Sequence, residues 1–176
     1  MRPRDPFQTP VSGKFNIEKK TTAAAQYWLA VQLGDNEDAW QAVIDFFPDE
    51  NAELERRRSE EKLALVHLQK GHFDKAKELF KKLAILGSES GAFRANAYAG
   101  LAGIASLEGD FSKSQRIIAV DLTPAIRKLP RFSQLDPQMQ SFMQRTRALN
   151  AQHLREKFDK DIDDLFQRAI SNDELP

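Results

Sequence analysis

The chain contains three histidines, His67, His72 and His153, and these are the side chains best suited to bind a metal or to transfer a proton. His67 and His72 are five residues apart across a glycine, whereas the H-x-x-x-H spacing would place two imidazoles on one helix face. Neither histidine is followed by a carboxylate. We therefore interpret His67 as a structural histidine, and we expect no metal ligand in this chain.

Two other stretches resemble chemical motifs but lack their essential residues. The acidic run Asp159–Asp164 has neither the central glycine nor the glutamate at the twelfth position of a calcium loop. The segment Gly87–Gly91 has Glu89 where the motif G-x-S-x-G requires serine, and no Gly-Lys-Ser/Thr follows it, so we predict a simple loop. Because no catalytic constellation is found, we expect that the protein is not an enzyme and needs no cofactor.

The charge balance limits the classes of partner. Lys+Arg and Asp+Glu number 26 each, and this zero net charge argues against a protein that grips nucleic-acid phosphates or an anionic bilayer. The absence of cysteine excludes disulfides and thiolate metal sites, and no apolar run is long enough to span a membrane. We expect a soluble, cytoplasmic protein, or the soluble part of a longer chain, that binds no nucleic acid and does not insert into a membrane.

Three glycines mark a repeated pattern of paired helices. Gly34, Gly71 and Gly109 lie 37 and 38 residues apart, between apolar residues at helical spacing. Small residues recur five positions after each glycine and large apolar residues nine positions after it, namely Ala39, Ala76 and Ser114, and Val43, Phe80 and Ile118. A small residue lets two helix backbones approach, and its apolar neighbours fill the surrounding space. The pattern predicts an all-α protein built from antiparallel helix hairpins.

This spacing resembles the tetratricopeptide repeat, a helix–turn–helix unit of about 34 residues. The resemblance rests on Leu63, Ala64, Gly71, Phe73, Ala76 and Phe80, and on Leu101, Ala102, Gly109, Phe111 and Ser114. It implies an α-solenoid of about three helix hairpins over residues 19–122, preceded by an extended N-terminal arm over residues 1–18. Residues 123–176 are predicted to form an irregular linker and a C-terminal capping helix, because a solenoid needs a cover for its last apolar face.

In tetratricopeptide proteins, the first helices of successive repeats line a concave groove. The resemblance places on that face the six residues that we predict to bind a partner, Trp28, Gln32, Arg58, Lys62, Leu65 and Asn96. We therefore expect a non-catalytic module that binds a peptide or a partner protein. Two alternatives stay open. The chain could be an accessory or regulatory domain of a larger protein, membrane-anchored or enzymatic, or a spacer that homodimerises through its last helix.

The densest run of charges covers residues 49–62. Glu53 and Arg57 within it are spaced i, i+4, which stabilises a helix by a few tenths of a kcal/mol. We interpret the run as a solvated helix face, with Arg58 and Lys62 as its candidate binding residues.

Two glycines, Gly100 and Gly103, lie inside a helix predicted over Phe93–Leu107. Each costs about 1 kcal/mol relative to alanine, so a close packing contact should compensate. The apolar residues between Pro137 and Ile170 recur at helical spacing, as one helix or two, and Asp136 is a good cap for their start. We predict that this C-terminal helix packs over the glycines. The alternative is that the glycines only fit their helix against its neighbours in the repeats.

Overall fold

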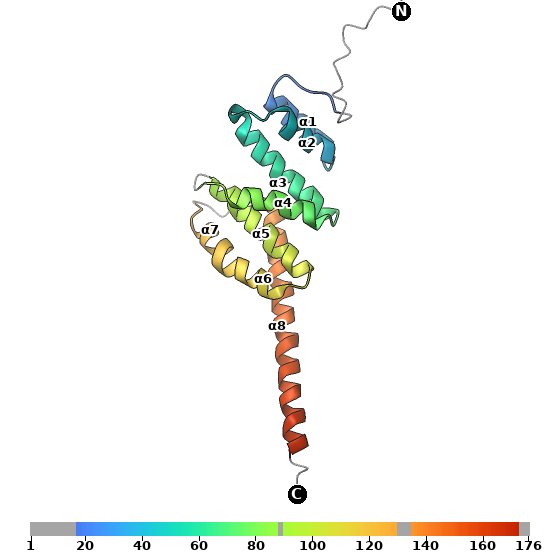
Figure 1. The fold of residues 1–176 in the computed structure, drawn as a ribbon, viewed down its shortest axis with the longest axis vertical. Helices are drawn as coiled ribbons and strands as arrows, with labels where there is room; N and C mark the ends of the chain where they lie inside the picture. Colours follow the sequence, from blue (N-terminus) through green and yellow to red (C-terminus); the bar gives the residue numbers. More distant parts are fainter. Residues whose placement is uncertain (1–16, 88–89, 130–134, 173–176) are drawn as a thin grey trace, which may run out of the picture.

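The computed structural model describes residues 17–87, 90–129 and 135–172, with the side chains of the last helix described as far as Asp164. All the regular structure of these residues is helical, which confirms the all-α prediction for the described chain (Figure 1). The helices in chain order are α1 (Ala23–Leu33), α2 (Glu37–Phe46), the 3₁₀ turn Glu50–Ala52, α3 (Glu53–Gln69), α4 (Phe73–Ala84), α5 (Gly91–Leu107), α6 (Phe111–Arg116), the π-helical segment Ile117–Leu122, α7 (Thr123–Arg127) and α8 (Pro137–Asn172). Most of the predicted N-terminal arm, residues 1–16, lies outside the described residues. Ile17 at its end is buried against the first hairpin.

Each predicted glycine turn joins the two helices of a hairpin. Gly34, Gly71 and Gly109 have φ of 61°, 74° and 81°, a backbone conformation that costs glycine least. A Cβ at any of the three would meet nothing within 4 Å, so conformation rather than space requires glycine there. At the second turn, the amide of His72 donates to the carbonyl of His67 at 2.8 Å, which ties the first residue after the turn to the end of α3.

The small residues of the repeat pattern lie at helix contacts. Ala39, Ala76 and Ser114 are fully buried, as are the large residues Val43 and Phe80. The structure therefore confirms at these five positions that the residues five and nine positions after a turn glycine are buried.

Two clusters of buried residues form the core, and α3 belongs to both. Leu63 and Val66 of α3 pack with the first hairpin, while Ala64 and Leu65 pack with α4, α5 and α8. Because α3 supplies residues to both clusters, the first hairpin and the later helices are packed together through this one helix.

Helix α5 begins at Gly91, two residues before the predicted start, so the predicted loop Gly87–Gly91 ends inside the first turn of a helix.

Pro124 accounts for the π-helical segment that follows α6. A proline ring clashes with the carbonyl four residues earlier and donates no hydrogen bond to it, so the backbone widens there. At the end of this segment, the Ile118 carbonyl accepts both the backbone amide of Thr123 and the Thr123 hydroxyl, the latter at 2.7 Å. The helix α7 therefore lies within the segment predicted to be an irregular linker.

The C-terminal segment forms one continuous helix rather than two. Asp136 caps it, as predicted, because its carboxylate accepts from the Gln138 amide at 2.8 Å. The first four turns bury Met139, Met143, Thr146 and Asn150, a stripe of helical spacing that faces α5 and α6. Beyond this stripe, α8 extends away from the other helices (Figure 1).

The contact between α8 and α5 occurs at Gly103. A Cβ added there would overlap the ring of Phe142, which confirms the prediction that the C-terminal helix packs over this glycine. A Cβ at Gly100 would instead lie 2.5 Å from the ring of Phe80 on α4. For Gly100 the alternative therefore holds, since this glycine fits α5 against a helix of the repeats.

Candidate functional site

The start of α8 lies beside the part of the predicted binding face that belongs to α3 and α5. The Nζ of Lys62 on α3 lies 2.5 Å from Oδ2 of Asp136, the residue that caps α8. Pro137, the first residue of α8, lines hollows on both of its sides. The expected groove is thus divided into two parts.

The larger part is an apolar cleft of about 540 Å³ between α3, the end of α5 and the first turns of α8. Its walls carry four large apolar side chains and its rim carries polar ones. The lining residues are Leu65, Leu68, Gln69, Leu107, Pro137, Gln138, Ser141, Phe142 and Arg145. A smaller hollow of about 120 Å³, beside the first glycine turn, shares Leu65, Gln69 and Gln138 with this cleft. The second part, of about 390 Å³, lies on the other side of Pro137 and is more polar.

The six predicted residues are not brought together on one surface. Leu65 lines the apolar cleft but is only 4% exposed, and Lys62 is engaged by Asp136. Arg58 and Asn96 line the second hollow, although Asn96 itself is buried. Trp28 and Gln32 are both exposed on α1, and Trp28 stacks edge-on against Tyr27.

A buried carboxylate lies beneath the start of α8. Glu61 is 8% exposed, and its Oε1 accepts from Nδ2 of Asn96 at 2.6 Å. Burial, with a contribution from the nearby charge of Asp136, raises the pKa of Glu61 to about 7, although the Asn96 hydrogen bond opposes the rise. The interpretation of residues 49–62 as a solvated face is therefore wrong at Glu61, and it is also wrong at the fully buried Ser59. No local pattern indicates this burial, because the groups that bury Glu61 come from α5 and α8.

A polar network joins three helices at the other end of α5. The hydroxyl of Ser106 lies 2.8 Å from the hydroxyl of Ser114 on α6 and donates to Oδ1 of Asn150 on α8 at 2.8 Å. Nδ2 of Asn150 donates to Ser114 at 3.0 Å. All three residues are buried, so the network fixes the angle at which α8 crosses the third hairpin.

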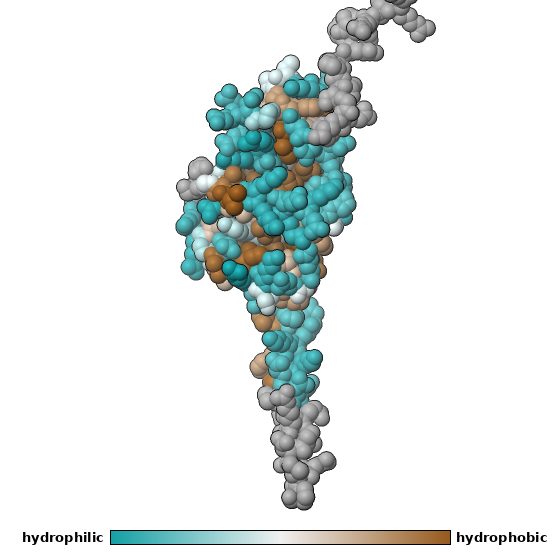
Figure 2. Space-filling view, in the orientation of Figure 1, coloured by the Kyte–Doolittle hydropathy of each residue, from teal (hydrophilic) through white to brown (hydrophobic). Residues whose placement is uncertain are grey.

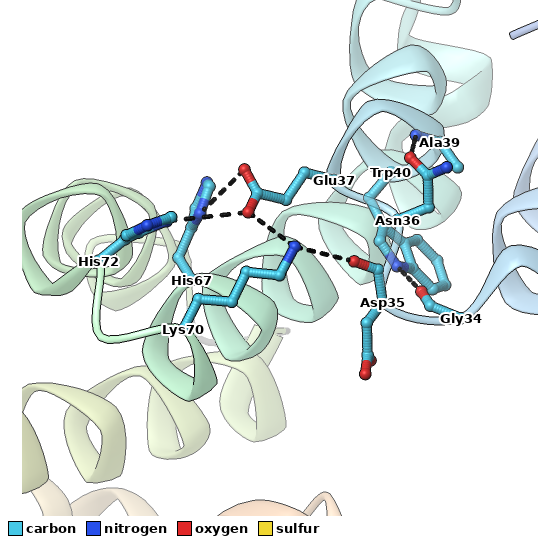
Figure 3. Close-up of polar contacts among 9 residues, drawn as sticks. All are labelled: Gly34, Asp35, Asn36, Glu37, Ala39, Trp40, His67, Lys70 and His72. Carbon is cyan, nitrogen blue, oxygen red and sulfur yellow. Dashed lines mark hydrogen bonds and ion pairs between the residues drawn. The ribbon is translucent and has the colours of Figure 1, made fainter. Parts of the chain in front are cut away.

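A third cluster lies where the first hairpin meets the second turn (Figure 3). Oε2 of Glu37, the first residue of α2, lies 3.5 Å from Nδ1 of His67, and its Oε1 lies 3.8 Å from Nδ1 of His72. Nζ of Lys70 lies 3.0 Å from the same Oε1. The Lys70 hydrogen bond is the main cause that lowers the pKa of Glu37, and burial lowers the pKa of His67. In the described part of the chain, Glu37, His67 and His72 are the group whose ligand atoms could hold a metal.

None of the described helices has the length and apolar character needed to cross a bilayer. Comparison with protein-family models, with curated proteins and with solved structures found no match for this chain.

Proposed function

We propose that the chain is a non-catalytic protein-interaction module. In this proposal the hairpins stack in the manner of tetratricopeptide repeats, and the apolar cleft between α3 and α8 binds a peptide or a segment of a partner protein. The single observation that carries the proposal is the cleft itself, because it combines apolar walls with a solvated polar rim on a side that the repeat pattern assigned to binding.

The walls of the cleft favour an apolar side chain as the anchor. Leu68 and Phe142 pack partly into the core and leave one face toward the hollow, which the buried Leu65 also lines. Leu107 at the end of α5 is 51% exposed and lines the same cleft. A bound aliphatic or aromatic residue would remove this surface from water, at about 25 cal/mol for each Å² buried.

The polar rim of the cleft can bind the backbone of a peptide and a negatively charged side chain. Gln69, Gln138 and Ser141 are exposed and can donate to or accept from the backbone of an extended peptide. Arg145 supplies a positive charge one turn beyond Ser141. The expected ligand therefore has an apolar anchor with a carboxylate close to it.

The test is selection from a phage-displayed library of random peptides on the immobilised chain. We expect enriched peptides to share an apolar residue next to an acidic one. Ser141→Trp should fill the cleft and abolish their binding, whereas Gln144→Trp, an exposed position on the same helix that does not line the cleft, should leave binding unchanged. Equal binding by the two variants would place the site elsewhere.

A second candidate function is homodimerisation through α8, and it is favoured by the apolar side chains on its projecting part. Leu154 and Phe158 are 52% and 63% exposed, and Ile162 continues their i, i+4 spacing. Figure 2 shows apolar atoms on this part of the surface, outside the packed body. Light scattering should give a dimer for the wild type and a monomer for Phe158→Glu. Lys157→Glu, a charge change on the neighbouring residue, should remain dimeric.

A further inference from the structure

The residues Glu37, His67 and His72 occupy three helix ends that the fold brings together. Glu37 is the first residue of α2, held by the cap in which Asn36 Oδ1 accepts from the Ala39 amide at 3.2 Å. His67 lies in the last turn of α3, and His72 directly precedes α4. The glycine turn between the two histidines fixes their relation, and their ring centroids are 5.8 Å apart. The three ligand atoms lie within 4.8 Å of one another.

One buried nitrogen of this cluster has no hydrogen-bond partner among the described residues. His67 is 6% exposed, and its buried Nδ1 makes no hydrogen bond to any described group. That nitrogen faces Glu37 Oε2 at 3.5 Å. A neutral imidazole nitrogen without a proton and a carboxylate oxygen are both acceptors, so their approach requires a cation or a proton between them. Nδ1 of His72 faces the other oxygen of the same carboxylate, and Figure 3 shows the two imidazoles side by side in front of Glu37.

We propose that Glu37, His67 and His72 form a binding site for a zinc ion, with Nδ1 of each histidine and one oxygen of Glu37 as ligands and water in the fourth position. Two imidazoles and one carboxylate are a donor set that zinc takes in proteins. The chain has no cysteine, so softer metals that select thiolates have no ligand here.

The three ligand atoms, which lie within 4.8 Å of one another, must move closer together to hold the ion. Ligands at about 2.0–2.1 Å from a tetrahedral zinc are about 3.3–3.4 Å apart. The Glu37–His67 separation of 3.5 Å is already close to this, and His72, whose side chain is 47% exposed, is the ligand that would have to move inward. Glu37 and His67 also line a hollow of about 350 Å³, which gives the ion a path from solvent.

Lys70 has a defined place in this site. Its Nζ contacts Oε1 of Glu37, while Oε2 faces His67, so the carboxylate can bind the ion through Oε2 and keep Lys70 on Oε1. Nζ of Lys70 also donates to the Asp35 carbonyl at 3.3 Å, which holds it beside the first turn. Such contacts orient a ligating carboxylate from outside. Because Lys70 is also a nearby positive charge, it opposes binding of the ion.

The consequence of metal binding is a link between two hairpins. Glu37 belongs to the first hairpin and both histidines to the second, and the zinc would join α2 to the turn between α3 and α4. An ion that binds only the folded arrangement stabilises it.

The test is zinc titration of the untagged chain by calorimetry, using zinc sulfate alone, with thermal unfolding measured in parallel. We expect one zinc per chain and a higher Tm with zinc. His72→Ala is the main variant because His72 is exposed and its loss should not unfold the protein. It should weaken zinc binding at least about tenfold and remove the Tm increase. His153→Ala, which alters the third histidine, stacked on Phe111, should bind as the wild type does.

Two further outcomes decide the proposal. Lys70→Gln keeps a side-chain N–H that can donate to Oε1 of Glu37 and removes the opposing charge, so it should bind zinc as tightly as the wild type or more tightly, and a loss of binding would count against the proposed carboxylate geometry. The cobalt-substituted chain should show the visible absorption of a tetrahedral site, and this absorption should be missing in His72→Ala. The proposal is overturned if the wild type does not bind zinc, or if His72→Ala binds it as the wild type does.

Discussion

The buried carboxyl of Glu61 predicts a stability that falls as the pH rises. Burial raises the pKa of Glu61 from the usual 4.5 to about 7 in the folded protein. The folded state therefore binds more protons than the unfolded state between these two values, and the free energy of unfolding decreases across that range. Above pH 7 the folded state carries the full cost of a buried charge. A shift from 4.5 to about 7 corresponds to about 3 kcal/mol at pH 8 and about 1 kcal/mol at pH 5.

Glu61→Gln removes this cost and keeps the hydrogen bonds. The amide oxygen introduced by the substitution would accept from Nδ2 of Asn96, as the carboxylate does at 2.6 Å. The new amide nitrogen would offer a donor to Oδ1 of Asn96, which is buried without a hydrogen bond to any described group. The variant should therefore be more stable than the wild type by about 3 kcal/mol at pH 8, and by only about 1 kcal/mol at pH 5.

The assay is urea unfolding of both proteins at the two pH values. Glu78→Gln, an exposed glutamate on α4, is the control and should change the free energy of unfolding by less than about 0.5 kcal/mol at either pH. A stabilisation by Glu61→Gln that is equal at pH 5 and pH 8, or a destabilisation at pH 8, would refute the reasoning. Either result would mean that Glu61 remains ionised in the folded protein without cost.

Substitutions at three buried contacts, with their controls, test the packing. Ala76→Leu should destabilise the central hairpin by about 1–3 kcal/mol in chemical unfolding, because Ala76 is fully buried, whereas Lys75→Leu on the exposed face should be nearly silent; equal effects would contradict the hairpin contact. Gly103→Ala should cost about 1–3 kcal/mol despite its better helix propensity, because its Cβ overlaps Phe142, and Phe142→Leu should recover part of the loss in the double variant. Asn150→Ala should cost about 1–3 kcal/mol by leaving two buried hydroxyls short of a partner, and an unchanged Tm would show that the network contributes nothing.

Local patterns predicted the hairpins because the physics that determines them is local. A positive φ at Gly71 follows from the demand of a tight turn, and a buried Ala76 follows from its distance along the chain from that turn. The capping of α8 by Asp136 belongs to the same class. In each case the residues that decide the structure are neighbours in the sequence, so one chain is enough to see them.

The candidate sites depend on contacts between distant residues, and here the sequence was insufficient. Glu61 looked like one more charge in a solvated run, but Asn96 and Asp136 reach it from other helices. Glu37 is three residues after the first glycine turn and His67 four residues before the second. A search for ligands around successive turns, rather than along one helix, could have paired them. The missed signal was the recurrence of the glycine turns, since the fold brings the start of α2, after the first turn, next to the second turn.

The two glycines of α5 show why α8 belongs to the protein's proposed binding surface. Gly100 lets Phe80 of α4 approach from one side, and Gly103 lets Phe142 of α8 approach from another. Phe142 is at once the residue seated on Gly103 and a wall of the apolar cleft. The packing of Phe142 on Gly103 and the shape of the cleft are therefore coupled, because any rotation that moves Phe142 away from Gly103 also alters the wall of the cleft. A ligand that contacts both α3 and α8 must then stabilise the seating of α8, since it binds the seated arrangement and not the displaced one.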